Sequence, residues 1–329
     1  MPFLFPRDGD ASPTPASALS STSDPSSPTR QMLINTFLAL QMLGLIGSIA
    51  LVLTTTLSSR AARNATWQNF FTSWIISTVS YALLLLAGQA GKATPSFGVC
   101  LAQAGLIYGI PSLTAATTFG LIAQIWFSVQ TLLLHKIKYE RFWIIGILVL
   151  PYCMMFGMVL ASWVSGMRHP ESVTIIGSGM YCHLSHTSLL GRVSAALVAF
   201  TLIPTLGLEI SICIALRRNW STFKRMKNSM SITLRVMLFT LIGILAISLS
   251  AVFVFSDNHG ASLNIVFACM PVIAVIIFST QKDILNVWMF WKPRFAGTGK
   301  TLEGSGSGLG SDGSSSTAAL RRSDAAASV

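Results

Sequence analysis

The chain has 329 residues, of which 52% are hydrophobic and only 10% are charged, and its net charge is +11. Its mean hydropathy of +0.64 excludes an ordinary soluble domain, because soluble chains carry about 25% charged residues. In a membrane protein this basic balance favours anionic lipid, rather than nucleic acid, as the partner of the charges.

Seven apolar stretches follow one another along the chain, each close to the roughly 20 residues that a helix needs to cross a bilayer. Lipid offers the backbone no hydrogen-bond partners, so unbroken runs of this length favour helices over a β-barrel. We therefore predict an all-α, polytopic membrane protein with a seven-transmembrane helix bundle over residues 31–280. The predicted spans are Gln31–Leu57, Trp67–Ala90, Cys100–Leu134, Phe142–Gly166, Leu190–Arg217, Met230–Phe255 and Leu263–Thr280.

Basic residues are divided unequally between the two sides that seven spans would create. One side, which includes the C-terminal tail, holds 17 of the 22 Lys and Arg residues. Since the excess of positive charge marks the cytoplasmic side, we expect the N-terminus outside and the C-terminus in the cytoplasm. The plasma membrane is the expected location.

Three segments lie outside the predicted bundle. Residues 1–30 are rich in Ser and Pro, and residues 294–329 are rich in Gly and Ser. Such compositions predict a disordered extracellular N-terminus and a disordered cytoplasmic tail. Residues 281–293 combine tryptophans with lysines, which predicts an amphipathic helix lying on the inner membrane surface.

Two of the five cysteines are expected to form a disulfide. Cys153, Cys213 and Cys269 lie in spans, where a lone cysteine usually packs as a small apolar residue. Cys100 opens the third span at its outer end, and Cys182 lies in the loop after the fourth. Only these two face an oxidising compartment in this topology, so a bond between them is favoured over two unpaired thiols.

Seven spans, an outside N-terminus and this cysteine pair resemble the G-protein-coupled receptor superfamily over residues 31–293. The third span ends in Ser128–His135 without an Asp-Arg-Tyr triplet, and the seventh has Met270-Pro271 where the rhodopsin-like subgroup has Asn-Pro. The segments Arg63–Trp67 and Phe71–Ser77 look more like divergent fungal seven-helix receptors. The resemblance implies that an extracellular ligand drives a helix rearrangement, which is passed to a heterotrimeric G protein.

Two ionisable residues stand out inside the spans, where such side chains are costly. Glu209 lies about two turns from the inner end of the fifth span, and Arg235 lies early in the sixth. One hypothesis is an ion pair that holds the inner helix ends together in the resting state and opens on activation, although the alternative that follows is slightly favoured. In the alternative, Arg235 reaches the lipid head groups, while Glu209 is protonated or bonded to a hydroxyl.

Polar and aromatic residues recur at helical spacing in the outer halves of three spans. They could line a pocket for a small, neutral or rather apolar ligand. Close helix packing in lipid uses the same residue types, and we favour that role for most of them. The candidates are Trp74, Ser77, Tyr81, Gln103, Ile107, Thr114, Thr118 and Asn264.

The third cytoplasmic loop is basic, with aromatic residues between the charges. Such a loop could contact a G-protein α subunit or the anionic leaflet, and the leaflet is the simpler partner for most of the charge. The basic residues in question are Arg217, Arg218, Lys224, Arg225 and Lys227.

Other functional classes find less support in the sequence. Hydrolase, zinc-protease and phosphate-loop motifs are missing, so we expect neither an enzyme nor a metal site or cofactor. A retinal protein would need a lysine in the seventh span, and Leu263–Thr280 has none. A carrier of a small neutral solute is the alternative to a receptor, although the spans contain a single acid, Glu209.

Overall fold

The computed structural model describes residues 28–58, 63–90, 92, 94–134, 141–176, 179–185, 188–218, 235–238, 240–241, 244 and 261–289. Residues from Phe290 onward form a second unit outside this range. The longer helices are α1 (Pro28–Leu57), α2 (Ala65–Tyr81), α4 (Phe97–Leu134), α5 (Arg141–Arg168), α6 (Ser188–Arg218) and α9 (Ala261–Ser279). Shorter elements are α3 (Leu83–Leu86), a 3-10 turn (Pro170–Ser172), β1 (Val173–Ile175), β2 (Cys182–Leu184) and α10 (Lys282–Trp288).

Within the described residues, four helices are long and apolar enough to cross a membrane, namely α1, α4, α5 and α6. Only 22% of the most apolar stretch of α5, and the same share of α6, is buried within the protein. Large side chains such as Phe156 and Leu160 on α5 and Phe200 and Ile203 on α6 point outward instead. Apolar surface on this scale suits lipid rather than water, which identifies a mostly helical membrane protein.

The described helices follow the predicted spans, with helix ends that differ by a few residues and one break. The predicted Trp67–Ala90 span is divided at Ala82 into α2 and the single turn α3. α1 begins at Pro28, three residues earlier than predicted, because proline's fixed φ suits the first helical turn. The Met230–Phe255 span lies mostly outside the described residues, and residues 1–27 and 290–329 lie wholly outside them.

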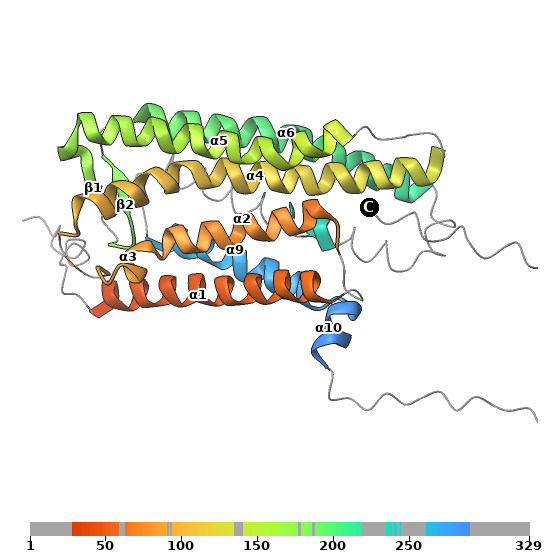
Figure 1. Ribbon diagram of the computed structural model, residues 1–329, viewed down its shortest axis with the longest axis horizontal. Helices are drawn as coiled ribbons and strands as arrows, with labels where there is room; N and C mark the ends of the chain where they lie inside the picture. Colours follow the sequence, from red (N-terminus) through yellow and green to blue (C-terminus); the bar gives the residue numbers. More distant parts are fainter. Residues whose placement is uncertain are drawn as a thin grey trace, which may run out of the picture. The chain divides into compact units, whose positions relative to one another are not determined.

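Helix α4 occupies the centre of the described bundle, beside α2, α5 and α6, while α1 packs against α2 and α9 (Figure 1). β1 and β2 form an antiparallel hairpin that covers the start of α4, with Val173 opposite Leu184 and Ile175 opposite Cys182. We call this the hairpin end of the bundle. The opposite end, where α9 passes into α10, is the α10 end.

Glycines allow two helix pairs to approach closely. A Cβ added at Gly44 would lie 2.8 Å from Pro271 of α9, and one at Gly47 would lie 2.5 Å from Val275. Gly105 and Gly109, one turn apart on α4, face Trp163 and Met155 of α5 in the same way. Small residues at this spacing are what helices use to pack in lipid, where no hydrophobic effect drives them together.

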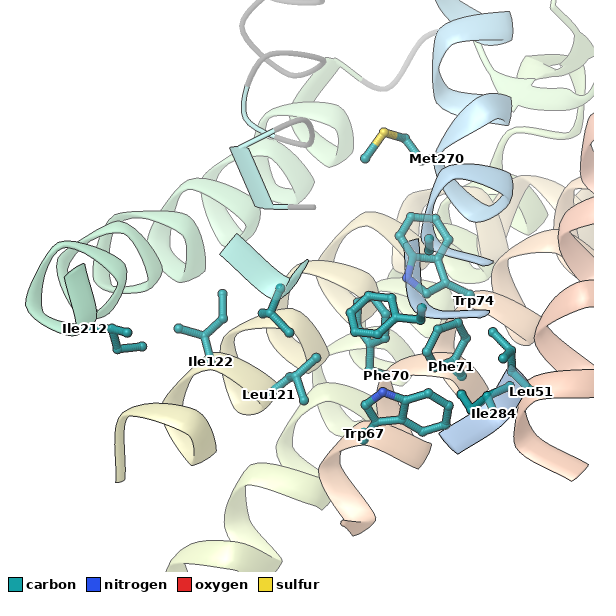
Figure 2. Packing of buried hydrophobic residues seen from close by; sticks show 13 residues of the cluster. Leu51, Trp67, Phe70, Phe71, Trp74, Leu121, Ile122, Ile212, Met270 and Ile284 are labelled. Carbon is teal, nitrogen blue, oxygen red and sulfur yellow. The ribbon is translucent and has the colours of Figure 1, made fainter. Parts of the chain in front are cut away.

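The largest buried cluster gathers aromatic side chains of α2 near the α10 end. Trp67, Phe70 and Phe71 pack around Phe278 of α9, with ring centroids between 5.4 and 6.2 Å from that of Phe278. Figure 2 shows Leu51 and Ile284 beside these rings. One buried core thus joins α1, α2, α9 and α10. A movement of α9 would therefore change the packing of α10 against this core.

Candidate functional sites at the two ends of the bundle

The predicted disulfide is confirmed. Cys100, in the first turn of α4, is bonded to Cys182, the first residue of β2, with their Cα atoms 5.3 Å apart. Both cysteines are buried. The hairpin that covers this end of the bundle is therefore attached covalently to the start of α4.

Gln103, one turn after Cys100, links three segments by hydrogen bonds and is fully buried. Its Nε2 donates to the carbonyl oxygens of Ser80 at 3.1 Å and Tyr81 at 3.2 Å, at the end of α2. Its Oε1 accepts from the backbone N–H of Cys182 at 3.0 Å. A residue expected to line a pocket therefore holds α2, α4 and β2 together.

Aromatic rings fill the space between α1, α2 and the loop that precedes β2. The ring of Tyr81 meets those of Phe37 and Tyr181 edge-on, with centroids 5.9 and 5.6 Å away. The Tyr181 hydroxyl donates to Oδ1 of Asn264 at 3.0 Å, at the start of α9. The structure thus brings together two predicted pocket residues, Tyr81 and Asn264, through Tyr181, which the sequence interpretation missed.

The other predicted pocket residues are engaged in packing or bonded within their own helix. Trp74 belongs to the buried core, Ser77 is buried and Ile107 is partly buried. The Thr114 hydroxyl donates to the Ile110 carbonyl and that of Thr118 to the Thr114 carbonyl. Whether any of these residues contacts a ligand stays a prediction.

Side-chain hydrogen bonds also join α2 to its neighbours within the bundle. The hydroxyls of Ser73 and Thr117 lie 2.8 Å apart between α2 and α4, and Thr66 donates to Gln124 of α4 nearer the α10 end. On the α5 side, the Tyr152 hydroxyl donates to Oδ1 of Asn69 at 2.6 Å. Such bonds hold neighbouring helices in a fixed register in lipid.

Glu209 and Arg235 have different partners in this conformation. The Arg235 guanidinium donates to the carbonyl of Ile277 and to the hydroxyl of Thr280, where α9 ends. Glu209 is buried, and the Thr240 side chain lies near its carboxyl group. The predicted pairing of Glu209 with Arg235 in the resting state stays a prediction, while Arg235 in this structure binds the helix end that leads into α10.

Arg63, between α1 and α2, holds the α9–α10 junction at the α10 end. Its Nη2 donates to Oε1 of Gln281 at 2.6 Å and to Oδ2 of Asp283 at 3.2 Å. Its side chain is only 14% exposed. In addition, Nε1 of Trp288 donates to the Thr54 hydroxyl at 2.8 Å, which attaches the far end of α10 to α1.

The predicted basic contact surface is described only in part. Arg217 and Arg218 close α6 as exposed residues at the α10 end. Lys224, Arg225 and Lys227 lie outside the described residues. The two described arginines suit the carbonyl groups of a helix C-terminus, which attract positive charge.

Burial shifts the pKa values of two titratable groups at the hairpin end, Tyr181 and His183. Burial raises the pKa of Tyr181, and the nearby Tyr81 and Tyr108 raise it further. Burial lowers the pKa of His183 on β2, while its hydrogen bond with the Thr174 carbonyl opposes that shift. Within the described residues, no group of three or more His, Cys, Asp or Glu side chains could hold a metal ion.

Compared with known proteins, the sequence matches no protein-family model and is significantly similar to no curated protein. What the chain does must therefore be argued from its own contacts.

Proposed function

We propose that the protein is a seven-helix receptor in the plasma membrane, which senses an extracellular ligand and transmits a helix rearrangement to a cytoplasmic G protein. In this proposal the hairpin end faces outward and the α10 end faces the cytoplasm. The observation that supports this proposal is the difference between the hairpin end and the α10 end. A disulfide fixes the hairpin to α4, while the α10 end is joined by polar side-chain bonds that can be exchanged for others.

The ligand would act at the hairpin end, where Tyr81, Tyr181 and Asn264 connect α2, the loop and α9. A ligand that competes for the Asn264 amide would release the start of α9. Because Arg235 donates to Ile277 of α9 and to Thr280 directly after it, and α9 leads into α10, a movement of α9 would change the surface offered to a cytoplasmic partner. Differential binding to two such arrangements is what a receptor requires.

The test is complex formation with a G protein. The full chain is placed in nanodiscs with a heterotrimeric G protein, free nucleotide is removed, and the complex is isolated with and without peptide and lipid extracts. We expect co-purification that is lost when a non-hydrolysable GTP analogue is added. A variant with Arg217 and Arg218 changed to glutamine tests the contact surface: it should weaken the complex without unfolding the protein.

Absence of a complex under every condition, from folded protein with its disulfide intact, would overturn the receptor proposal. Uptake of neutral solutes by reconstituted vesicles would then identify a carrier.

A further inference from the structure

Arg63 and Gln281 form a buried pair of polar side chains at the α10 end. Nη2 of Arg63 lies 2.6 Å from Oε1 of Gln281, so the guanidinium and the amide group are in direct contact. Gln281 is 4% exposed, and the Arg63 side chain is 14% exposed. The pair connects the segment between α1 and α2 with the junction of α9 and α10.

Each of these two side chains also has a buried donor nitrogen without a partner in the described part of the chain, Nε of Arg63 and Nε2 of Gln281. A guanidinium offers its Nε–H and one Nη–H along a single edge, a fork that fits two oxygen atoms of a carboxylate or phosphate. Here Nη2 serves two acceptors, Oε1 of Gln281 and Oδ2 of Asp283. Because a buried donor without an acceptor is costly, the pair favours a ligand with several acceptor oxygen atoms.

Asp283 occupies only part of this fork. Its Oδ2 lies 3.2 Å from Nη2 of Arg63, and its side chain is 46% exposed. A single contact of this kind contributes little to stability, because solvent screens it. An anion that displaced the Asp283 carboxylate could accept from both Nη2 and Nε of Arg63 and from Nε2 of Gln281. Asp283 therefore competes for the site and does not saturate it.

A second guanidinium adds positive charge beside the pair. Arg235 donates to the hydroxyl and to the carbonyl oxygen of Thr280, the residue directly before Gln281. Among the described residues, two guanidinium groups and one carboxylate thus meet at the junction of α9 and α10. This balance of charge favours an anionic ligand.

The depth of the pair in the membrane favours a lipid as the source of that anion. Leu53 and Leu57, in the last two turns of α1, are exposed apolar side chains suited to lipid tails, and Arg63 follows shortly after them. Trp288 of α10, which lies beside this end of α1 (Figure 1), donates to Thr54. Tryptophan is typical of the level of the lipid head groups, where phosphate is the prevailing anion.

We propose that Arg63 and Gln281 bind the phosphate group of an anionic membrane lipid in place of the Asp283 carboxylate. Arg63 donates through Nε and Nη2, and Gln281 donates through Nε2. The exchange couples the lipid composition of the membrane to the attachment of α10. It requires only that this end of the bundle lies at a membrane surface, so it does not rest on the receptor proposal, and its failure would leave that proposal unchanged.

The test is native mass spectrometry of the full chain, released from nanodiscs in which the share of phosphatidylglycerol in phosphatidylcholine is varied. We expect the wild type to retain phosphatidylglycerol, whose only charge is on its phosphate. Arg63→Lys keeps the positive charge without the fork and should lower the apparent affinity at least about tenfold, the effect of one charge-assisted hydrogen bond. Asp283→Asn removes the competing carboxylate and should raise the affinity by up to about fivefold.

The matched control is Arg168→Lys, the same substitution at an exposed arginine of the hairpin end, which should leave lipid retention unchanged. Inorganic phosphate, added to the nanodiscs before release, separates a lipid site from a site for a free anion. We expect it to leave the retained lipid in place, because the lipid is held at the membrane surface.

The proposal is overturned if the wild type retains no phosphatidylglycerol, or if Arg63→Lys and Asp283→Asn both retain it as the wild type does. Equal losses in Arg63→Lys and Arg168→Lys would show a diffuse attraction of charges and no site. Displacement of the lipid by inorganic phosphate would show that the site takes a free anion, which contradicts the assignment to lipid. If Arg63→Lys does not fold, the gain expected in Asp283→Asn decides the question, since that change leaves Arg63 and Gln281 in place.

Discussion

Gln103 shows how one side chain can set the position of several segments. Its three hydrogen bonds, to Ser80, Tyr81 and Cys182, join groups that lie 23, 22 and 79 residues away in the chain. In a fully buried position each broken bond leaves a polar backbone group without a partner, and such a group costs more than a hydrogen bond contributes. The residue is therefore a structural link whose effect on ligand binding would be indirect.

We predict that Gln103→Leu lowers the free energy of unfolding by about 3 kcal/mol, because the backbone groups of Tyr81 and Cys182 lose a buried partner. Gln89→Leu is the control, since its bonds to Ser96 are exposed, and it should cost less than about 0.5 kcal/mol. Thermal unfolding in nanodiscs measures both. Equal effects of the two changes would show that Gln103 has no special structural role.

Arg63 makes the corresponding link at the α10 end, and its two acceptors differ in exposure. Gln281 is buried, while Asp283 is 46% exposed. We predict that Asp283→Asn costs less than about 1 kcal/mol, because solvent screens that ion pair. Arg63→Ala should cost about 1–3 kcal/mol, because it leaves the Gln281 amide oxygen without its donor.

The control is Arg168→Ala, which removes an exposed arginine from the end of α5 and should change stability little. A double-mutant cycle between Arg63→Ala and Asp283→Asn isolates the pair. If Asp283→Asn costs as much without Arg63 as with it, the ion pair contributes nothing.

At the scale of elements, the glycines of α4 determine how closely α5 approaches. A Cβ at Gly109 would lie 2.9 Å from the backbone carbonyl oxygen of Met155, which cannot move aside cheaply. We predict that Gly109→Ala destabilises the bundle by about 1–3 kcal/mol through overpacking. Gly157→Ala on α5 is the control, since nothing lies within 4 Å of its Cβ position.

Gly157→Ala should be neutral or stabilising, because alanine has the higher helix propensity. The measurement is again the unfolding midpoint of each variant in nanodiscs. A tolerated Gly109→Ala together with a damaging Gly157→Ala would contradict the packing of α4 on α5.

The β1–β2 hairpin should respond to pH through His183. Its pKa lies below the ordinary value because burial disfavours the charged ring. The unfolded hairpin therefore takes up a proton at a higher pH than the folded one. The stability from neutral His183 is complete above about pH 6.5 and declines as the pH falls below it.

Amide hydrogen exchange of residues 173–175 and 182–184, corrected for the intrinsic effect of pH on exchange, should show weaker protection at about pH 5.5 than at about pH 7.5. His183→Gln should remove this difference. The nearby pair of His169 and Glu171 is left intact in that variant, so a difference that persists would assign the effect to the pair.

The helices were largely predictable from sequence, because a long apolar run has few alternatives in lipid. The break at Ala82 was not, since alanine and the leucines that follow it all favour helix. Tyr181 could have been noticed as the neighbour of Cys182. In contrast, Arg235 binds a backbone carbonyl, an acceptor that carries no residue-specific signal, and Arg63 meets Asp283 across 220 residues.

At the scale of the whole molecule, the exposed apolar faces of α5 and α6 make a prediction about the two cysteines that lie on them. Cys153 and Cys213 are exposed at the protein surface, yet lipid should cover both. We predict that a membrane-impermeant maleimide does not label them in intact membranes and labels them after denaturation in detergent. Labelling of either cysteine in the native membrane would place its helix face in water.

The same chemistry can determine the proposed orientation. In a background with Cys153, Cys213 and Cys269 changed to serine, one cysteine is introduced in place of Lys92 at the hairpin end or Arg217 at the α10 end, both exposed. We expect the impermeant reagent to label Lys92→Cys on intact cells and Arg217→Cys only after permeabilisation, because the basic loops should stay inside. The reverse pattern would place the disulfide-linked hairpin in the cytoplasm, where disulfides rarely persist, and would contradict the receptor orientation.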